Sequence, residues 1–162
     1  MLVRRHSPVA MRTAALLGAG PDAEDVVQEA WVKAYRSLGR FRTTEPFRPW
    51  LLRIVANEAH NHHRAAVRRG ARERRVLQAE LLDPAGEVAD REDRERLLRA
   101  VGQLPDRLRT VVTCRYLLEL DEAETARVLA IPKGTVKSRL SRGLAQLRGV
   151  LGVDAGEAAR HA

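Results

Sequence analysis

The stretch that decides the fold reads "IPKGTVKSRLSRGLAQLR" and covers residues 131–148. Its aliphatic side chains recur at helical spacing and therefore share one arc of a helix: Val136, Leu140, Leu144 and Leu147. Ser138 and Arg142 lie roughly opposite this arc. Five of the side chains are basic and none is acidic, whereas solvated helices usually mix both signs. The pattern predicts an anchored helix whose basic face meets a negatively charged partner.

A short helical segment precedes this helix. Residues 121–130, "DEAETARVLA", have the spacing of a helix, and "IPKG" at 131–134 breaks it with Pro132 and Gly134. Helix, tight turn and basic helix form the helix-turn-helix plan, in which the second helix enters the DNA major groove. The alternative is a solvated amphipathic helix with an accidental charge bias. The candidate DNA-binding residues are Lys133, Thr135, Lys137, Ser138, Arg139, Ser141 and Arg142.

Nearly all of the remaining chain also has helical periodicity. Residues 21–38 and 50–69 place apolar side chains on one face, and Gly39 marks the end of the first of these segments. Two further helical segments cover 91–104 and 105–120. Because the alternation typical of strands is absent, the sequence predicts an all-α fold.

The composition narrows the classes of function. Of the 162 residues, 44% are hydrophobic and 31% charged, and the formal net charge of +8 favours a polyanionic partner, either nucleic acid or an anionic membrane surface. There is no run of about 18 apolar residues that would cross a bilayer, and a cytoplasmic protein is expected. Cys114 is the single cysteine, so an internal disulfide is impossible and a small buried side chain is expected.

The charge changes sign abruptly in the middle of the chain. Residues 64–75 hold six arginines and one glutamate, whereas residues 78–93 hold six acids and one arginine, with Pro84 and Gly86 among them. This reversal predicts an acidic linker between two small domains. The predicted boundaries are a first domain at 1–75, a flexible linker at 76–93, a second domain at 94–152 and a frayed tail at 153–162.

The sequence "HNHH" at 60–63 allows an enzymatic alternative, either a metal site or a nuclease of the His-Asn-His type. His60 and His63 are close enough on a helix to share a metal ion, yet no acidic residue completes its shell. A solvated or phosphate-facing surface is the simpler interpretation. Since no nucleophile elbow, phosphate loop or paired carboxylate site is present, neither a catalytic site nor a cofactor is expected.

Both halves of the chain resemble the extracytoplasmic-function (ECF) group of the sigma-70 family of bacterial RNA polymerase sigma factors. Residues 22–41 are similar to the region 2 helix that docks on the clamp helices of the polymerase. Residues 47–64 are similar to the helix that melts the promoter and reads its −10 element, and residues 104–148 to region 4, which reads the −35 element. The resemblance covers residues 4–151 and implies a region 2 helical bundle followed by a region 4 helix-turn-helix.

The resemblance also implies roles for particular residues. The surface that binds the polymerase would comprise Asp25, Gln28, Glu29, Trp31, Val32 and Tyr35. The loop that captures a flipped base would use Phe41, Arg42, Phe47 and Arg48. One face of the following helix would read the −10 element through Trp50, Arg53, Asn57, Asn61 and Arg64, and Arg68 would lie against the phosphates of the same element. Asn61 departs from the aspartate of many relatives, and Asp121 and Thr125 depart from a small polar and an aliphatic residue.

A sigma factor of this group binds core RNA polymerase through the clamp helices and the flap, and directs it to promoter DNA without being an enzyme. An anti-sigma factor is a further expected partner of the family, and a membrane is not. Two other functions stay open at this point. One is a stand-alone helix-turn-helix regulator that uses only residues 94–151, and the other is a sigma-like antagonist that occupies the polymerase without initiating transcription.

Overall fold

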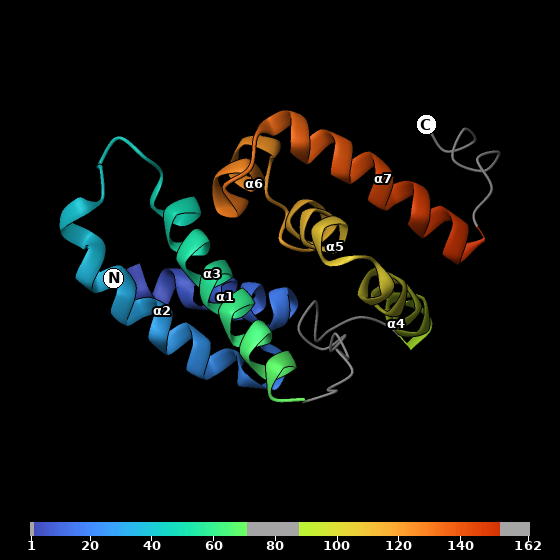
Figure 1. Cartoon of the computed structure of the whole chain (residues 1–162), viewed down its shortest axis with the longest axis horizontal. Helices are drawn as coiled ribbons and strands as arrows, with labels where there is room; N and C mark the ends of the chain where they lie inside the picture. Colours follow the sequence, from blue (N-terminus) through green and yellow to red (C-terminus); the bar gives the residue numbers. More distant parts are fainter. Residues whose placement is uncertain (1, 71–87, 153–162) are drawn as a thin grey trace.

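The computed structural model describes residues 2–70 and 88–152, and within these ranges every regular element is helical (Figure 1). The all-α prediction is confirmed. No described helix has the length and the apolar character needed to cross a membrane. The main helices are α1 (Leu2–Ala14), α2 (Ala23–Ser37), α3 (Phe47–Arg68), α4 (Val88–Gln103), α5 (Asp106–Val112), α6 (Glu122–Leu129) and α7 (Lys133–Leu151).

The first three helices form a bundle with an alanine-rich core. Ala10, Ala30, Leu51 and Ala59 are completely buried where α1, α2 and α3 meet. A π-helical turn, η1 (Ala15–Ala19), ends α1 at Gly18, whose φ of 131° is strained for any other residue. A β-carbon at Gly18 would lie 3.0 Å from the Cβ of His63 on α3, so this glycine lets the corner close.

Two helices begin earlier than the sequence predicted. α3 starts at Phe47 rather than at residue 50, because Pro46 in extended conformation is its N-terminal boundary. α4 starts at Val88, so residues 88–93 of the predicted linker are helical. Acidic residues are favoured near the start of a helix as well as in a linker, so a charge count alone does not distinguish the two. The rest of that linker, at 76–87, and the predicted tail, at 153–162, lie outside the described residues.

The helix-turn-helix forms as predicted, with α6 and α7 as its two helices. Asp121 caps α6: its Oδ1 accepts from the backbone N–H of Glu124 at 2.7 Å, and the Glu124 carboxylate accepts from the N–H of Asp121 at 3.0 Å. Hydrogen bonding to the backbone N–H of Glu124 lowers the pKa of Asp121. This capping role accounts for the aspartate that departs from the family pattern.

The turn between the two helices is shorter than the predicted break. Ala130 ends α6 in the left-handed conformation, with a φ of 53°, and Pro132 is the N-cap of α7. Lys133 and Gly134, which the sequence analysis assigned to the break, are therefore the first residues of α7.

A second core holds α7 against α4 and α5. It contains Ala100, Val101, Leu104, Leu108, Val112 and Leu147, with Leu140 and Leu144 packed at its edge. Val136 is also buried, which confirms the predicted aliphatic arc. The backbone approaches closely at Gly143, where a β-carbon would lie 2.7 Å from the Cγ2 of Val112.

The α5–α6 corner also packs against the first bundle. α6 lies beside α3 (Figure 1), and Cys114, Leu118, Leu120 and Val128 belong to one apolar cluster with the core of α1, α2 and α3. Cys114 is fully buried, as the sequence predicted, and burial raises the pKa of its thiol to about 12. The two halves of the molecule therefore share a continuous core.

Four rings anchor the loop between α2 and α3 to both α1 and α3. Phe41 lies 4.9 Å from Trp50 and 5.7 Å from Phe47 between ring centroids, and Phe47 lies 5.5 Å from Trp50. The His6 ring of α1 completes the cluster at 5.3 Å from Phe47. Burial lowers the pKa of His6, and the nearby Arg5 and Arg48 cations lower it further.

Replacing Gly143 by alanine tests the close contact between α5 and α7. Although alanine favours a helix, its methyl group would collide with Val112, so Gly143→Ala should lower the free energy of unfolding by about 1–3 kcal/mol. Gly149→Ala on the same helix meets no atom within 4 Å and should raise it by up to about 1 kcal/mol. Urea unfolding of both variants measures the difference. Equal effects of the two substitutions would contradict this packing.

The pH dependence of stability tests the aromatic cluster. The pKa of His6 is lower in the folded chain than its usual 6.5, so below that pH the unfolded chain takes up the proton first. The contribution of His6 is therefore present above pH 6.5 and is lost as the pH falls through its folded pKa. His6→Phe keeps a ring but cannot titrate. When the pH is lowered from about 7.5 to about 5, the melting temperature of the wild-type protein should decrease by more than that of this variant. Parallel curves would show that His6 does not pack as described.

Candidate nucleic-acid and polymerase interfaces

The basic face of α7 points to solvent, as predicted. Lys133, Lys137, Ser138, Ser141 and Arg142 are exposed on it. The other two candidates on this helix, Thr135 and Arg139, are half-buried at its edges. Because Val136 and Leu147 are held in the core, the helix cannot rotate this face away.

Local hydrogen bonds order the exposed side chains of α7. The Ser138 hydroxyl donates to the carbonyl of Thr135 at 3.2 Å, and the Nε of Arg142 donates to the carbonyl of Ser138 at 3.2 Å. This contact uses one donor of a guanidinium that carries five, which leaves its outer amino groups for an acceptor outside the helix. Arg142 is thus held near the helix surface through its Nε.

An acidic residue of the preceding helix opposes this basic face, although residues 131–148 contain none. Glu122 of α6 places its carboxylate 4.0 Å from the Nζ of Lys137. The two residues are far enough apart in sequence that only the turn between α6 and α7 brings them together. The charge of Lys137 is therefore partly compensated by Glu122, whereas α7 itself contains no acidic residue.

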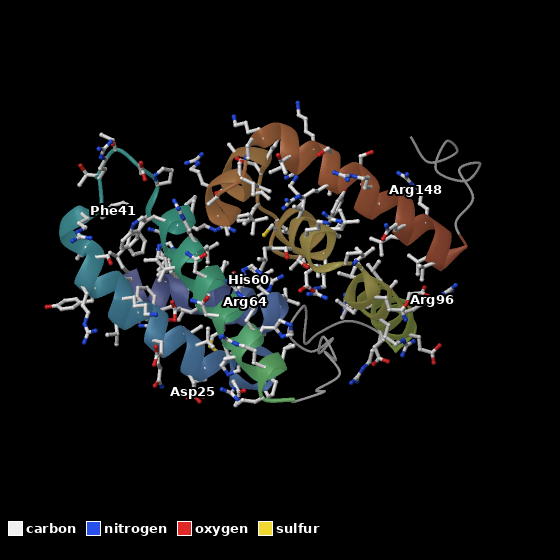
Figure 2. The ribbon with its side chains drawn as sticks, in the orientation of Figure 1. Asp25, Phe41, His60, Arg64, Arg96 and Arg148 are labelled. Carbon is white, nitrogen blue, oxygen red and sulfur yellow. The ribbon has the colours of Figure 1, made fainter. Side chains whose placement is uncertain are left out.

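A second polar face lies along α3. Arg53, Asn57, Asn61, Arg64 and Arg68 are exposed along it, and the Nη2 of Arg64 donates to the Oδ1 of Asn61 at 3.3 Å. The predicted common face is confirmed for these residues, and Trp50 at its start is half-buried in the aromatic cluster. Figure 2 shows Arg64 on α3 in the first bundle and Arg148 far along α7 in the second.

Asn57 borders a groove between α2 and α3. The groove is also lined by Lys33, Arg36, Ser37, Ile54 and Glu58. The Nζ of Lys33 lies 2.6 Å from the Oε2 of Glu58, an ion pair that joins the two helices beside Asn57. Sequence reasoning missed Lys33 and Glu58 because they lie on different helices and match no motif. A lysine and a glutamate that face each other across a groove become visible only when the packing of α2 on α3 is known.

The loop residues divide into anchors and exposed groups. Phe41 lies where the loop leaves α2, and it is half-buried together with Phe47 in the aromatic cluster (Figure 2). These two rings already pack against other rings of the protein in tilted and edge-on contacts, whereas Arg42 is exposed. Arg48 is half-buried, and its Nη2 donates to the carbonyl of Leu118 at 3.4 Å.

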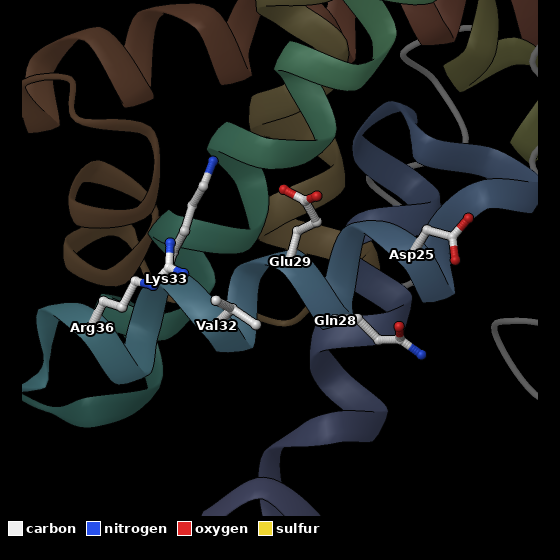
Figure 3. A pocket seen from close by; sticks show the side chains of 6 residues that line it. All are labelled: Asp25, Gln28, Glu29, Val32, Lys33 and Arg36. Atoms are coloured by element: carbon white, nitrogen blue, oxygen red, sulfur yellow. The ribbon is translucent and has the colours of Figure 1, made fainter.

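The outer face of α2 carries a shallow hollow with a charge gradient. Asp25, Gln28 and Glu29 line its first part, and Val32, Lys33 and Arg36 line its second part (Figure 3). Tyr35 is 81% exposed and Val32 is 50% exposed beside these charges. Trp31, in contrast, packs against the core and is half-buried. Exposed apolar groups among charges are typical of a protein-binding surface.

The histidines of "HNHH" face the protein more than solvent. The Nε2 of His62 lies 3.2 Å from the Oδ2 of Asp22, and His63 contacts Gly18. Within residues 2–70 and 88–152, no three histidine, cysteine or acidic side chains are grouped so as to hold a metal ion.

Comparison with known proteins identifies the same two halves. Residues 2–69 match the model of sigma-70 region 2, and residues 94–147 match that of sigma-70 region 4. The chain is 35% identical to the ECF RNA polymerase sigma-E factor of Escherichia coli K12 over 153 residues, which cover 88% of this chain and 80% of that protein. It is 38% identical to the RNA polymerase sigma-H factor of Pseudomonas aeruginosa PAO1 over 135 residues, covering 75% and 68%.

A solved structure has the same fold across both halves. The chain superimposes on CnrH, solved in complex with the cytosolic domain of CnrY, with a TM-score of 0.69 and 27% identity, covering 95% of this chain and 87% of that one. Matches to region 2 and region 4 together span most of the chain in the expected order. The chain belongs to the ECF group of the sigma-70 family of RNA polymerase sigma factors.

Proposed function

We propose that this chain binds core RNA polymerase and directs it to promoters, reading the −35 element with α7 and opening the −10 element with α3 and the preceding loop. The observation that carries the proposal is the presence, in one chain, of two separate exposed polar faces and of a third face, on α2, where exposed apolar side chains lie among charged ones. A stand-alone regulator would need only the α7 face. An antagonist of the polymerase would need neither of the two polar faces.

The face of α7 has the chemistry of direct base readout. Its N-terminal turns carry hydroxyls and cations, and arginine or lysine pairs well with the two major-groove acceptors of guanine. We assign base contacts to Lys137, Ser138 and Arg142, and backbone contacts to Lys133 at the start of the helix. Thr135, Arg139 and Ser141 complete the surface. Each phosphate neutralised by these cations should add about 0.9 to the logarithmic salt dependence of binding.

The face of α3 suits the strand that is separated during promoter opening. An amide such as that of Asn57 both donates and accepts, so it can read the exposed edge of an unpaired base. The groove beside Asn57 offers a place for that base, and Arg53, Arg64 and Arg68 are placed to contact phosphates. Since Phe41 and Phe47 already pack against Trp50, we assign them the role of holding the loop and give the strand contact to Arg42.

The face of α2 is proposed to dock on the clamp helices of the polymerase. Asp25, Gln28 and Glu29 would meet a basic surface, and Val32 and Tyr35 would supply the apolar contact. Trp31 is assigned to the core beneath this surface. The second domain would contact the flap, in the manner implied for region 4.

Further features of the proposal follow from the family. The chemistry of RNA synthesis belongs to the polymerase, so the chain itself is proposed not to be an enzyme, and its place of action is the cytoplasm. The domains correspond to region 2 within 1–75 and region 4 within 94–152. CnrH was solved with the cytosolic domain of CnrY, and we propose that this chain also has a protein regulator, of the anti-sigma class.

Arg142→Ala tests base readout by α7. On promoter fragments that the holoenzyme selects from genomic DNA, loss of a two-point contact to guanine should cost about 1–3 kcal/mol of binding free energy, with little change on random DNA. Arg148→Ala removes the same charge from an exposed position near the other end of α7 and should have a much smaller effect on the selected fragments. Quantitative binding assays measure both. An equal loss on random DNA would mean that Arg142 contacts only phosphate.

Asn57→Ala tests strand opening by α3. The variant should bind the −35 element as the wild type does. The yield of open complex should fall by about tenfold, because a lost amide–base contact costs about 1–3 kcal/mol and about 1.4 kcal/mol is a factor of ten. Permanganate reactivity of unpaired thymines measures opening independently of binding. Undiminished opening at matched occupancy would remove Asn57 from the proposed site.

A further inference from the structure

Two arginines of the first bundle reach across to the α5–α6 corner of the second. The Nη2 of Arg12 on α1 donates to the carbonyl of Leu117 at 2.7 Å, and that of Arg48 on α3 donates to the carbonyl of Leu118 at 3.4 Å. The donors and acceptors are 105 and 70 residues apart in the chain. Both hydrogen bonds therefore join one half of the molecule to the other.

The two acceptors lie at the end of a helix, where cations bind best. The π-helical turn η5 (Thr113–Leu117) extends α5, and Leu118 is its C-cap. Carbonyls at a helix C-terminus lack partners within the helix and carry the negative end of its dipole. The bond from Arg12, at 2.7 Å, has the length of a strong charge-assisted hydrogen bond, whereas the contact from Arg48, at 3.4 Å, is longer and weaker. Arg12 and Arg48 therefore act as external caps for this helix.

An apolar contact accompanies the two caps. Leu118, Leu120 and Val128 are at most 3% exposed and belong to the same cluster as the core of the first bundle. The contact also has a cost, because the Nε of Arg12 is buried without a hydrogen-bond partner. Opening the contact would return this Nε to water. The hydrogen bond from the Nη2 of Arg12 therefore stabilises the closed arrangement, whereas the burial of its Nε destabilises it.

The closed arrangement is too short for both promoter elements. Positions −35 and −10 differ by about 25 base pairs, which corresponds to about 85 Å along the duplex axis. A compact chain of this length has a radius of gyration of about 15 Å and hence a diameter of about 40 Å. With the two halves in contact, α3 and α7 cannot reach both elements of straight DNA at once.

We propose that Arg12 and Arg48 form a latch that keeps the free protein closed, and that Arg48 exchanges the Leu118 carbonyl for the DNA backbone when the protein opens. This inference rests on the proposed function. It assigns Arg12 a conformational role, because Arg12 lies on α1, a helix that carries none of the residues proposed to bind the polymerase or DNA. Closure therefore competes with promoter binding for one side chain, Arg48.

Small-angle X-ray scattering of the full chain tests the latch without polymerase or DNA. Arg12→Ala should increase the open population by about tenfold, the equivalent of about 1.4 kcal/mol, and raise the mean radius of gyration by several ångströms. Arg4→Ala is the matched control, since it removes the same charge from an exposed position of the same helix. Circular dichroism on each sample shows whether the helices are retained. Arg12→Lys keeps the charge and one donor, and should restore part of the compactness.

Unchanged scattering of Arg12→Ala, with helices retained, would overturn the latch. Expansion accompanied by loss of helix would also overturn it, because Arg12 would then support the fold of the bundle rather than the contact between halves. Run-off transcription separates this result from the proposed function. With a latch, Arg12→Ala should reach half-maximal transcription at a lower protein concentration than Arg4→Ala. If neither variant nor wild type supports transcription while Arg12→Ala still expands, the proposed function fails and the latch stands.

Discussion

The architecture depends on one constraint: each helix that faces a partner must bury its opposite side. α7 satisfies this constraint through Val136 and Leu147, and Gly143 lets its backbone approach α5 where a methyl group would collide with Val112. α3 does so with Leu51, Leu52 and Val55. Because the buried sides are fixed, the exposed cations and amides point in fixed directions. Apolar packing therefore sets the orientation of the charged faces. A net positive charge alone would attract DNA without fixing which face of a helix meets it.

The periodicity of the sequence was sufficient to predict the helices and the exposed faces of α3 and α7, because both depend on the spacing of residues within one helix. What it missed depends on contacts between distant residues. Glu122 beside Lys137, the ion pair of Lys33 with Glu58, and Arg12 on the carbonyl of Leu117 each join separate elements. The acidic stretch before residue 94 was interpreted as linker throughout, although its last residues are the start of α4. Charge reversal is typical of a linker and equally of an acidic first turn.

Several residues have a structural role in addition to, or in place of, the one that family resemblance assigns. Phe41 and Phe47 hold the loop through Trp50 and His6, which leaves Arg42 as its exposed cation. Trp31 supports the α2 surface from beneath. Arg48 serves the contact between the two halves in this closed arrangement. A motif match identifies which positions matter, whereas packing decides whether a side chain is available to a partner.

Transcription by purified core RNA polymerase, supplied with this protein and fragmented genomic DNA, tests the central claim most directly when the 5′ ends of the transcripts are sequenced. The account predicts new start sites that depend on the protein and lie downstream of one shared two-part element. Polymerase binding without such transcripts would contradict promoter-directed initiation and favour an antagonist. DNA binding without polymerase binding would contradict the assignment of the α2 face and favour a stand-alone regulator.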